Sequence, residues 1–290
     1  MIRIGVAGWD YPDWRGIVYP VETGSRFDRL AYISDFVDVV EINNSFYRPV
    51  DPRVAESWVR RTERHADFRF TAKTHRSWTH EPECDLDRDV GRTLDGLRPL
   101  LDAGRLGALL IQFPQSTRFR PAVSDHVDRL IDRCPDWPLV IEVRHASWGA
   151  DEVTEWFAQR AVGWCVVDQP DASPSTLGRL ARVTSPVAYV RLHGRNVANW
   201  FRPGAGRDAR YDYLYSATEL GQIAESARVM TQTAENLFVV QNNHFRGQAL
   251  VNALQMKRLL QQATPPAPGP LVSAYPDLEG QVAPRGRGLF

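Results

Sequence analysis

Short apolar runs recur along the chain and alternate with longer amphipathic stretches. The runs are rich in Val, Ile, Leu and Phe, which is typical of strands buried on both faces of a parallel sheet. They predict strands over Ile2–Ala7, Val37–Ile42, Phe68–Lys73, Ala108–Phe113, Leu139–Val143, Gly163–Asp168, Val187–His193 and Leu237–Gln241.

The stretches between these runs have helical spacing. Ser25 is a plausible N-cap of the first, Asp51-Pro52 supplies a cap followed by a first-turn proline, and Gly104 is placed to end the third. The predicted helices are Ser25–Phe36, Asp51–Thr62, Asp89–Ala103, Pro121–Arg133, Asp151–Gln159, Thr218–Glu235 and Gly247–Gln262, with a short one within Asp171–Arg182.

This alternation predicts a single α/β domain, a (β/α)8 TIM barrel, over residues 1–262. An open doubly wound sheet is the competing fold. It is disfavoured because Gly5-Val6-Ala7-Gly8-Trp9 carries no GxGxxG after the first strand. Residues 263–290 contain TPPAPGP and end in APRGRGLF, so we expect an irregular Pro/Gly-rich C-terminal tail.

Composition narrows the classes of protein. The 290 residues are 43% hydrophobic and carry 35 basic and 35 acidic side chains, so a global field that attracts nucleic acid or membrane is disfavoured. The three cysteines form no CxxC, no secretory signal is visible, and no apolar stretch is long enough for a membrane span. We expect a reduced, cytoplasmic protein with no membrane partner.

The last residues of the predicted strands are polar. Residues alternate between the two faces of a strand, so Glu41 aligns with Asn43 and Glu142 with Arg144. In a TIM barrel these ends form the active site, and three carboxylates there can neutralise nearby cations around a cavity. The carboxylates are Glu41, Glu142 and Asp168, and the cations are Lys73, Arg144 and Arg191.

Residue types suggest the chemistry. Arginine binds phosphate or carboxylate through two hydrogen bonds, and a buried glutamate can act as general acid or base. Lysine is rare, since only Lys73 and Lys257 occur; a lysine can serve as an electrostatic clamp or as an amine that forms an imine. Tyr47, Trp9 and Trp148 follow strand ends and suit either stacking on a base or sugar or packing in a lid.

A metal centre is a further possibility. Imidazoles at strand ends, together with the carboxylates, are ligand types for zinc, manganese or magnesium, but no HExxH or other compact spacing occurs. The histidines concerned are His75, His145, His193 and His244. Three cations in the same mouth would repel a metal ion, so no cofactor or metal residue is predicted and a divalent metal stays the minor alternative.

Several sequence blocks resemble the YecE-like family, also known as domain of unknown function seventy-two. They appear in order from residue 1 to about 260: VAGWDYPDWRGIVYP, VEINNSFYR, FRFTAKTHRSWTH, LLIQFP, IEVRHASW, VRLHGR and QNNHFRGQALVNALQMK. The resemblance implies a TIM barrel and leaves the reaction open. Its blocks include Phe46 as well as polar residues at the predicted strand ends. More distantly, the arrangement is similar to sugar-isomerase and apurinic-endonuclease barrels, which use a fuller set of metal ligands.

We therefore expect an enzyme, a hydrolase or isomerase, that binds a small anionic or sugar-phosphate-like substrate at the barrel mouth. The candidate catalytic residues are Glu41, Lys73, Glu142 and His193. The candidate substrate-binding residues are Trp9, Asn43, Tyr47, His75, Gln112, Arg144, His145, Asp168, Arg191, Arg195, Asn242, Asn243 and His244, with Asn243 and Gln112 orienting the substrate. The alternatives are a nucleic-acid-binding protein and a metal-dependent phosphoesterase.

Overall fold

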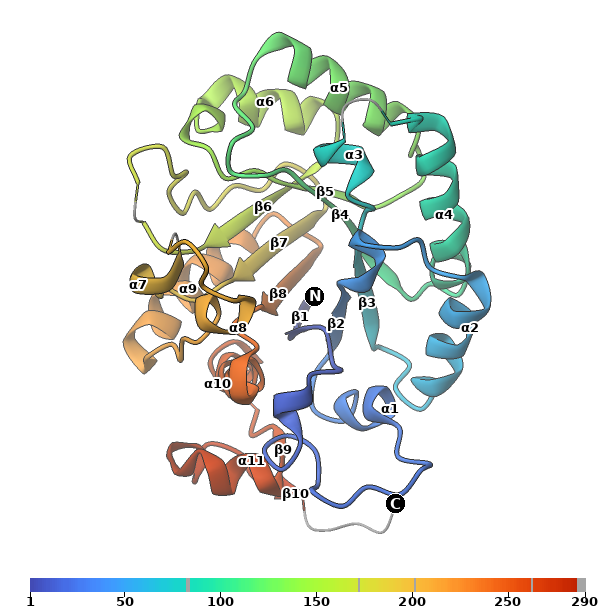
Figure 1. Ribbon diagram of the computed structural model, residues 1–290. Helices are drawn as coiled ribbons and strands as arrows, with labels where there is room; N and C mark the ends of the chain where they lie inside the picture. The colour runs from blue at the N-terminus through green and yellow to red at the C-terminus, as the bar shows by residue number, and fades with distance from the viewer. Residues whose placement is uncertain (82–83, 172, 201, 262, 286–290) are drawn as a thin grey trace.

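A closed parallel barrel forms the centre of the molecule (Figure 1). The computed structural model describes residues 1–81, 84–171, 173–200, 202–261 and 263–285. Neighbouring strands pair in chain order, and β1 pairs with β8 to complete the circle. The strands are β1 (Ile2–Ala7), β2 (Val39–Ile42), β3 (Arg69–Lys73), β4 (Leu106–Gln112), β5 (Leu139–Glu142), β6 (Gly163–Asp168), β7 (Val187–Leu192) and β8 (Asn236–Gln241). The TIM barrel predicted from the apolar runs is confirmed.

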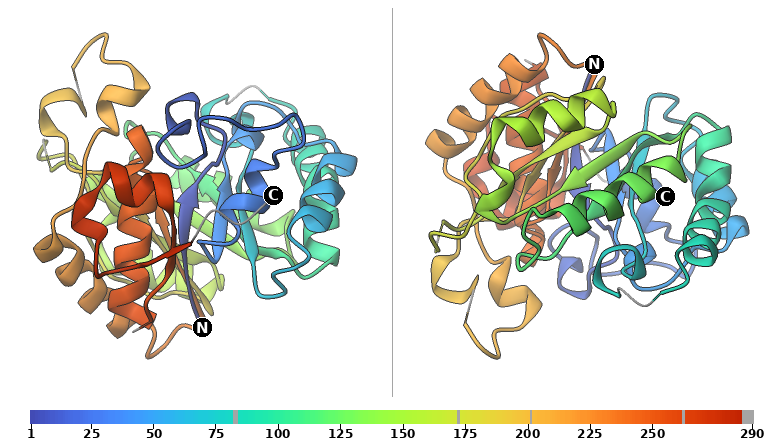
Figure 2. Two further views of the ribbon diagram at one scale, coloured as in Figure 1. Left: turned by 90° about the horizontal axis from the view of Figure 1, so that it is seen from below. Right: turned by 90° about the horizontal axis from the view of Figure 1, so that it is seen from above.

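Helices cover the outside of the barrel (Figure 2). Their caps explain several boundaries: Asp51 accepts a hydrogen bond from the Arg53 amide, and Ser216 forms a capping box with Glu219. The helices of this layer are α1 (Arg29–Ile33), α2 (Pro52–Arg61), α3 (Ser77–His80), α4 (Leu86–Asp102), α5 (Pro121–Asp132), α6 (Asp151–Gln159), α9 (Ala217–Met230) and α10 (Gln248–Gln261).

The barrel interior has its own apolar cluster, separate from the larger core between strands and helices. Where a strand contributes two members they are two residues apart, as with Cys165 and Val167 on β6, because alternate side chains point inward. The full cluster is Ala7, Val39, Ala108, Leu110, Val140, Cys165, Val167, Tyr189, Phe238 and Val240. This alternation decides which strand-end residues can reach the mouth.

Two helix predictions are wrong. The helix predicted from Ser25 begins only at Arg29, because the Asp28 carboxylate accepts a hydrogen bond from the Ala31 amide and so caps the chain there. The described residues of 171–182 form no helix. Thr176 instead makes an antiparallel bridge to His145, and the Leu177 amide donates to the Arg144 carbonyl, so this segment extends along the end of β5.

The connection from β7 to α9 is long and carries two short helices, α7 (Val197–Trp200) and α8 (Arg207–Arg210). It leaves β7 through Gly194, whose φ is +87° and where a Cβ would lie 2.6 Å from the Tyr213 side chain. Figure 2 shows this connection projecting from the end of the molecule opposite the N-terminus. The connection therefore stands at the mouth, where the parallel strands end.

The C-terminal segment is Pro- and Gly-rich, but the expectation that it is irregular is wrong. It forms α11 (Gly269–Ala274) and a two-stranded parallel sheet of β9 (Pro266–Pro268) and β10 (Ala283–Arg285). Leu271 and Leu278 are fully buried in the core that the barrel and its helices share. Burial of these leucines stabilises short elements that local propensity alone would not support.

Among the described residues, no helix is both long enough and apolar enough to cross a membrane.

Candidate functional site

A buried ion cluster closes the interior of the barrel just below the mouth. Arg191 donates from Nε and Nη2 to the Glu41 carboxylate at 2.9 and 2.6 Å, and from Nη1 to Glu142. Arg144 donates from Nε to the other Glu142 oxygen at 2.7 Å. The side chains of Glu41 and Glu142 are 0% exposed and that of Arg191 is 1% exposed. These four side chains therefore meet, as the alternation of residues along the strands predicted.

Charge pairing sets the protonation of this cluster. Burial by itself would raise the pKa of Glu142, but Arg144 and Arg191, with a hydrogen bond from His193, hold it well below its ordinary value. The same carboxylates outweigh the effect of burial on Arg191 and raise its pKa. Glu41 also accepts a hydrogen bond from the Tyr189 hydroxyl at 2.9 Å. The cluster is therefore two carboxylates matched by two guanidinium groups.

His193 lies beside the cluster and is fully buried. Its Nε2 is 3.2 Å from Arg144 Nη2, and its Nδ1 is 2.8 Å from the Asn242 side-chain amide. Burial and the Arg144 charge lower the pKa of His193 to about 3, which keeps the imidazole neutral at neutral pH.

Lys73, at the end of β3, has no counter-ion in the described part of the chain. Its Nζ lies 3.9 Å from the centre of the Phe46 ring, in the 3-10 turn η2 (Asn44–Phe46), and makes no hydrogen bond or ion pair with any described residue. Burial, together with the charges of Arg191 and Arg144, lowers the pKa of Lys73 to about 7, while Glu41 and Glu142 oppose the shift. The amine is thus half protonated near neutral pH.

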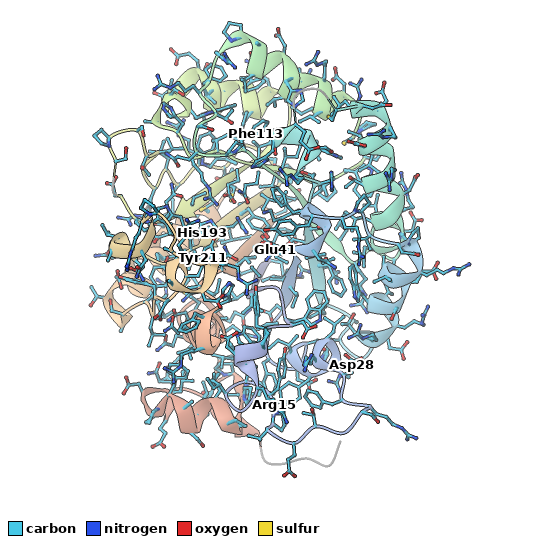
Figure 3. The ribbon with its side chains drawn as sticks, viewed as in Figure 1. Arg15, Asp28, Glu41, Phe113, His193 and Tyr211 are labelled. Carbon is cyan, nitrogen blue, oxygen red and sulfur yellow. The ribbon has the colours of Figure 1, made fainter. Side chains whose placement is uncertain are left out.

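Aromatic rings from the β7–α9 connection cover the mouth. The rings of Trp200 and Tyr211 are each centred 5.9 Å from that of His193, and Tyr211 is also 5.3 Å from His244. Figure 3 shows His193 and Tyr211 next to each other beside the short helices α7 and α8, with Glu41 nearer the centre of the barrel. The mouth is therefore a polar floor under an aromatic cover.

His244 lies against this cover without a polar partner. Its ring is 4.4 Å from that of Tyr11, and both ring nitrogens are buried and unpaired among the described residues. Burial and the Arg207 charge lower the pKa of His244 to about 4, so the ring is neutral at neutral pH. A neutral buried imidazole with free nitrogens can donate to or accept from a bound molecule.

The placement predicted for Asp168 is wrong. Asp168 follows the inward-facing Val167, so its side chain points the other way, toward α9. There it accepts hydrogen bonds from Arg195 at 2.7 and 2.9 Å and from the Tyr215 hydroxyl at 2.8 Å. Asp168 and Arg195 form an ion pair outside the barrel interior and do not face Lys73.

Other sequence candidates serve local structure. Asn243 donates to the Tyr213 carbonyl and to Asn252, both at 2.8 Å, so it ties the end of β8 to the β7–α9 connection and to α10. His75 and His145 each accept a hydrogen bond through Nδ1 from the backbone amide of the serine two residues later. These three residues therefore have structural partners of their own.

The remaining candidates follow or end strands but differ in their surroundings. Asn43 and Gln112 are partly exposed on the faces of β2 and β4 that also carry Glu41 and Leu110. Trp9 packs edge-to-face on Trp58 with ring centres 5.7 Å apart, and Tyr47 is 73% exposed. Trp148 is fully buried and packs against Phe113 and Phe119, so it is core rather than lid.

Sequence reasoning missed several residues of the mouth. Tyr189 was detectable, because it lies two positions before Arg191 on the same inward face of β7. Trp200, Arg207 and Tyr211 belong to a connection between elements, where no periodic pattern indicates which side chains turn toward the barrel.

The four candidate metal-ligand histidines are dispersed. The described part of the chain contains no group of three or more His, Cys, Asp and Glu side chains that could hold one ion.

The family follows from comparison with known proteins. A family model described as "Protein of unknown function DUF72" matches residues 3–272. The chain belongs to the DUF72 family. The resemblance inferred from the sequence blocks is therefore confirmed, and the match extends into the C-terminal segment that packs on the barrel.

Relatives of this family share both sequence and fold. UPF0759 protein YunF of Bacillus subtilis (strain 168) is 30% identical over 273 residues, which cover 90% of this chain and 95% of that protein. The crystal structure of a DUF72 family protein from Thermotoga maritima MSB8 matches with a TM-score of 0.79 at 31% identity, over 90% of this chain and 99% of that chain. A DUF72 family protein from Enterococcus faecalis V583 matches with a TM-score of 0.80 at 24% identity, over 91% and 96% of the two chains, which supports the fold alone.

Proposed function

We propose that this protein is an enzyme that binds a small anionic substrate, a carboxylate or a phosphate ester such as a sugar phosphate, at the C-terminal mouth of the barrel. The observation that carries the proposal is a surplus of positive charge. Glu41 and Glu142 balance Arg191 and Arg144, so a protonated Lys73 adds one charge without a partner. Buried charges are costly unless paired, and a bound anion would supply the missing partner.

Two basic side chains have the geometry to contact the anion. The Arg144 side chain is 13% exposed, and its Nη1 makes no hydrogen bond among the described residues, whereas Nε and Nη2 hold Glu142. Lys73 Nζ is equally free of polar partners within the described chain. A guanidinium N–H and an ammonium on one rim form a clamp for a carboxylate or phosphate oxygen.

The sequence suggested Glu41 and Glu142 as the groups that transfer protons. In this proposal Lys73 transfers the proton instead. A carboxylate whose pKa is held well below normal, as in Glu142, is a weak base at neutral pH. Lys73, with a pKa of about 7, can gain or lose a proton at that pH. In this scheme Glu41 and Glu142 orient the arginines, while Trp200 and Tyr211 offer ring faces to the rest of the substrate.

Binding of ribose 5-phosphate, compared with ribose, tests the proposal. Calorimetry should detect the phosphate ester and not the sugar, and affinity should fall at least about tenfold in Arg144→Gln and Lys73→Met, since each charged hydrogen bond contributes about 1.5–3 kcal/mol. Lys257→Met is the matched control, because Lys257 pairs with Asp38 at the other end of the barrel. Equal binding by all three folded variants would overturn the proposal.

The sequence-based alternatives, a nucleic-acid-binding protein and a metal-dependent phosphoesterase, stay predictions.

A further inference from the structure

The two lysines of this chain have opposite surroundings. Lys257 Nζ pairs with the Asp38 carboxylate at 2.7 Å and donates to the Phe36 carbonyl at 3.3 Å. Lys73 Nζ faces the Phe46 ring at 3.9 Å and has no carboxylate partner among the described residues. A carboxylate holds a lysine in its protonated form, and the face of the Phe46 ring offers the ammonium only a weaker cation–π contact. Burial beside Arg191 and Arg144 favours the neutral amine instead.

The neutral amine of Lys73 is populated near neutral pH. Burial and the charges of Arg191 and Arg144 bring its pKa to about 7, so about half of the molecules carry a free electron pair on Nζ. A lysine with an ordinary pKa of about 10.4 is neutral in fewer than about one molecule in a thousand at pH 7. Desolvation next to other cations is a known way to activate a lysine as a nucleophile.

The position of Lys73 also suits a nucleophile. It lies at the C-terminal end of β3, the end of a TIM barrel that carries catalytic groups. Arg144, two residues after β5, can hold an anionic group of the substrate through Nη1, which makes no hydrogen bond among the described residues, and the rings of Trp200 and Tyr211 lie near His193 at the same mouth. An amine, a basic side chain with a free N–H and aromatic rings are therefore combined at one mouth.

We propose that Lys73 forms an imine with the carbonyl group of an anionic aldehyde or ketone. Nζ attacks the carbonyl carbon and gives a carbinolamine. The carbonyl oxygen then leaves as water with the two hydrogens of the amine, and a C=N bond joins Nζ to the substrate. This inference rests on the proposed anion site and narrows its substrate to carbonyl compounds.

Reductive trapping tests the inference, and the small number of lysines makes the result easy to assign. The full-length protein is incubated separately with glycolaldehyde phosphate and with pyruvate, reduced with sodium cyanoborohydride, and mapped by peptide mass spectrometry. We expect at least one probe to label Lys73, at a level at least about tenfold above Lys257, because only the neutral amine reacts. Lys73→Arg should lose this label and Lys257→Arg should keep it.

Two further measurements separate the site from generic labelling. The rate of trapping should rise with pH to a plateau above pH 7, following the Lys73 amine. Glycolaldehyde without the phosphate should label Lys73 more slowly, and inorganic phosphate should slow labelling by glycolaldehyde phosphate.

The outcomes distinguish the two proposals. If ribose 5-phosphate binds through Arg144 but neither carbonyl probe labels Lys73 above Lys257, the imine proposal is wrong and the anion site stands. If Lys73 is labelled equally by glycolaldehyde and its phosphate, and ribose 5-phosphate does not bind, the amine is nucleophilic but the anion site is wrong.

Discussion

The two ends of the barrel both carry basic and acidic side chains, yet they differ in how the charges are matched. At the N-terminal end a cavity of about 490 Å³ is bordered by groups that include Arg3, Asp38 and Lys257. There Arg3 donates to Asn236 and to the Asp67 carbonyl, and Lys257 pairs with Asp38. At the mouth Glu41 and Glu142 pair with Arg191 and Arg144. Lys73 has no carboxylate partner there among the described residues.

This difference shows why a cavity alone does not indicate a site. In a TIM barrel, polar residues at the N-terminal face serve stability and those at the C-terminal face serve function. The paired charges near Lys257 agree with the first role, and the unpaired amine of Lys73 agrees with the second. Four substitutions test this difference, and their expected effects decrease in turn.

Replacement of the central arginine should have the largest effect. Arg191→Met would leave Glu41 without its bidentate partner and Glu142 without one of its two, both fully buried, and removal of one member of a buried ion pair costs about 3–5 kcal/mol. Urea unfolding at pH 7 measures the loss. A change in the free energy of unfolding below about 1 kcal/mol, the range of solvent-exposed ion pairs, would mean that the cluster contributes little to stability.

Replacement of Arg195 tests the position of Asp168 outside the mouth. In Arg195→Met, Asp168 would keep Arg179 and Tyr215, so we expect a smaller loss of about 2–3 kcal/mol from an ion pair that is only partly buried. Binding of ribose 5-phosphate, measured by calorimetry, should not change. Weaker binding by a folded Arg195→Met protein would mean that Asp168 and Arg195 do take part in substrate binding.

Replacement of Lys73 should stabilise the protein in a pH-dependent way. The pKa of Lys73 falls from 10.5 to about 7 on folding, so between these pH values the unfolded chain binds the extra proton and stability rises with pH. The full shift corresponds to a penalty of about 4 kcal/mol at pH 7. Lys73→Met removes this penalty but also loses the contact between the ammonium and Phe46, and the side chain is only partly buried, so the variant should exceed wild type by about 2 kcal/mol at pH 7 and by less at pH 9.5. Urea unfolding at both pH values checks the sign. If the variant is less stable than wild type at pH 7, burial of the protonated Lys73 amine does not destabilise the folded protein.

The smallest effect belongs to the other lysine. Lys257→Met loses one partly exposed pair with Asp38, which still accepts from Gln261 at 2.7 Å, so we expect a loss of about 1 kcal/mol or less. Thermal unfolding measures it, and binding and reductive labelling should match wild type. If this variant loses binding of ribose 5-phosphate, the conclusion that only the C-terminal end of the barrel binds substrate is wrong.

Some of the site could be predicted because strand periodicity is local. Glu41, Glu142 and Arg191 each occupy an inward position near the end of an apolar run, and these residues do meet. Asp168 occupies the end of such a run too, but in the opposite phase, and the sequence alone does not reveal where the phase of each strand begins. One residue of register exchanges the two faces, which is why Asp168 faces α9.

The aromatic cover could not be predicted in this way. Trp200 ends α7 and Tyr211 follows α8, in a connection whose path depends on Gly194 and on packing against His193. The same holds for the C-terminal segment, where Pro and Gly indicated irregular structure but burial of Leu271 and Leu278 stabilises regular elements.

The amino-acid sequence was sufficient to establish the parallel barrel, its order of strands and the polar character of their ends, because apolar runs and alternation act over a few neighbouring residues. It was not sufficient to show which charges neutralise one another and which lysine is left without a partner. Such pairing joins residues as distant along the chain as Glu41 and Arg191, and it depends on distances that exist only once the barrel has closed.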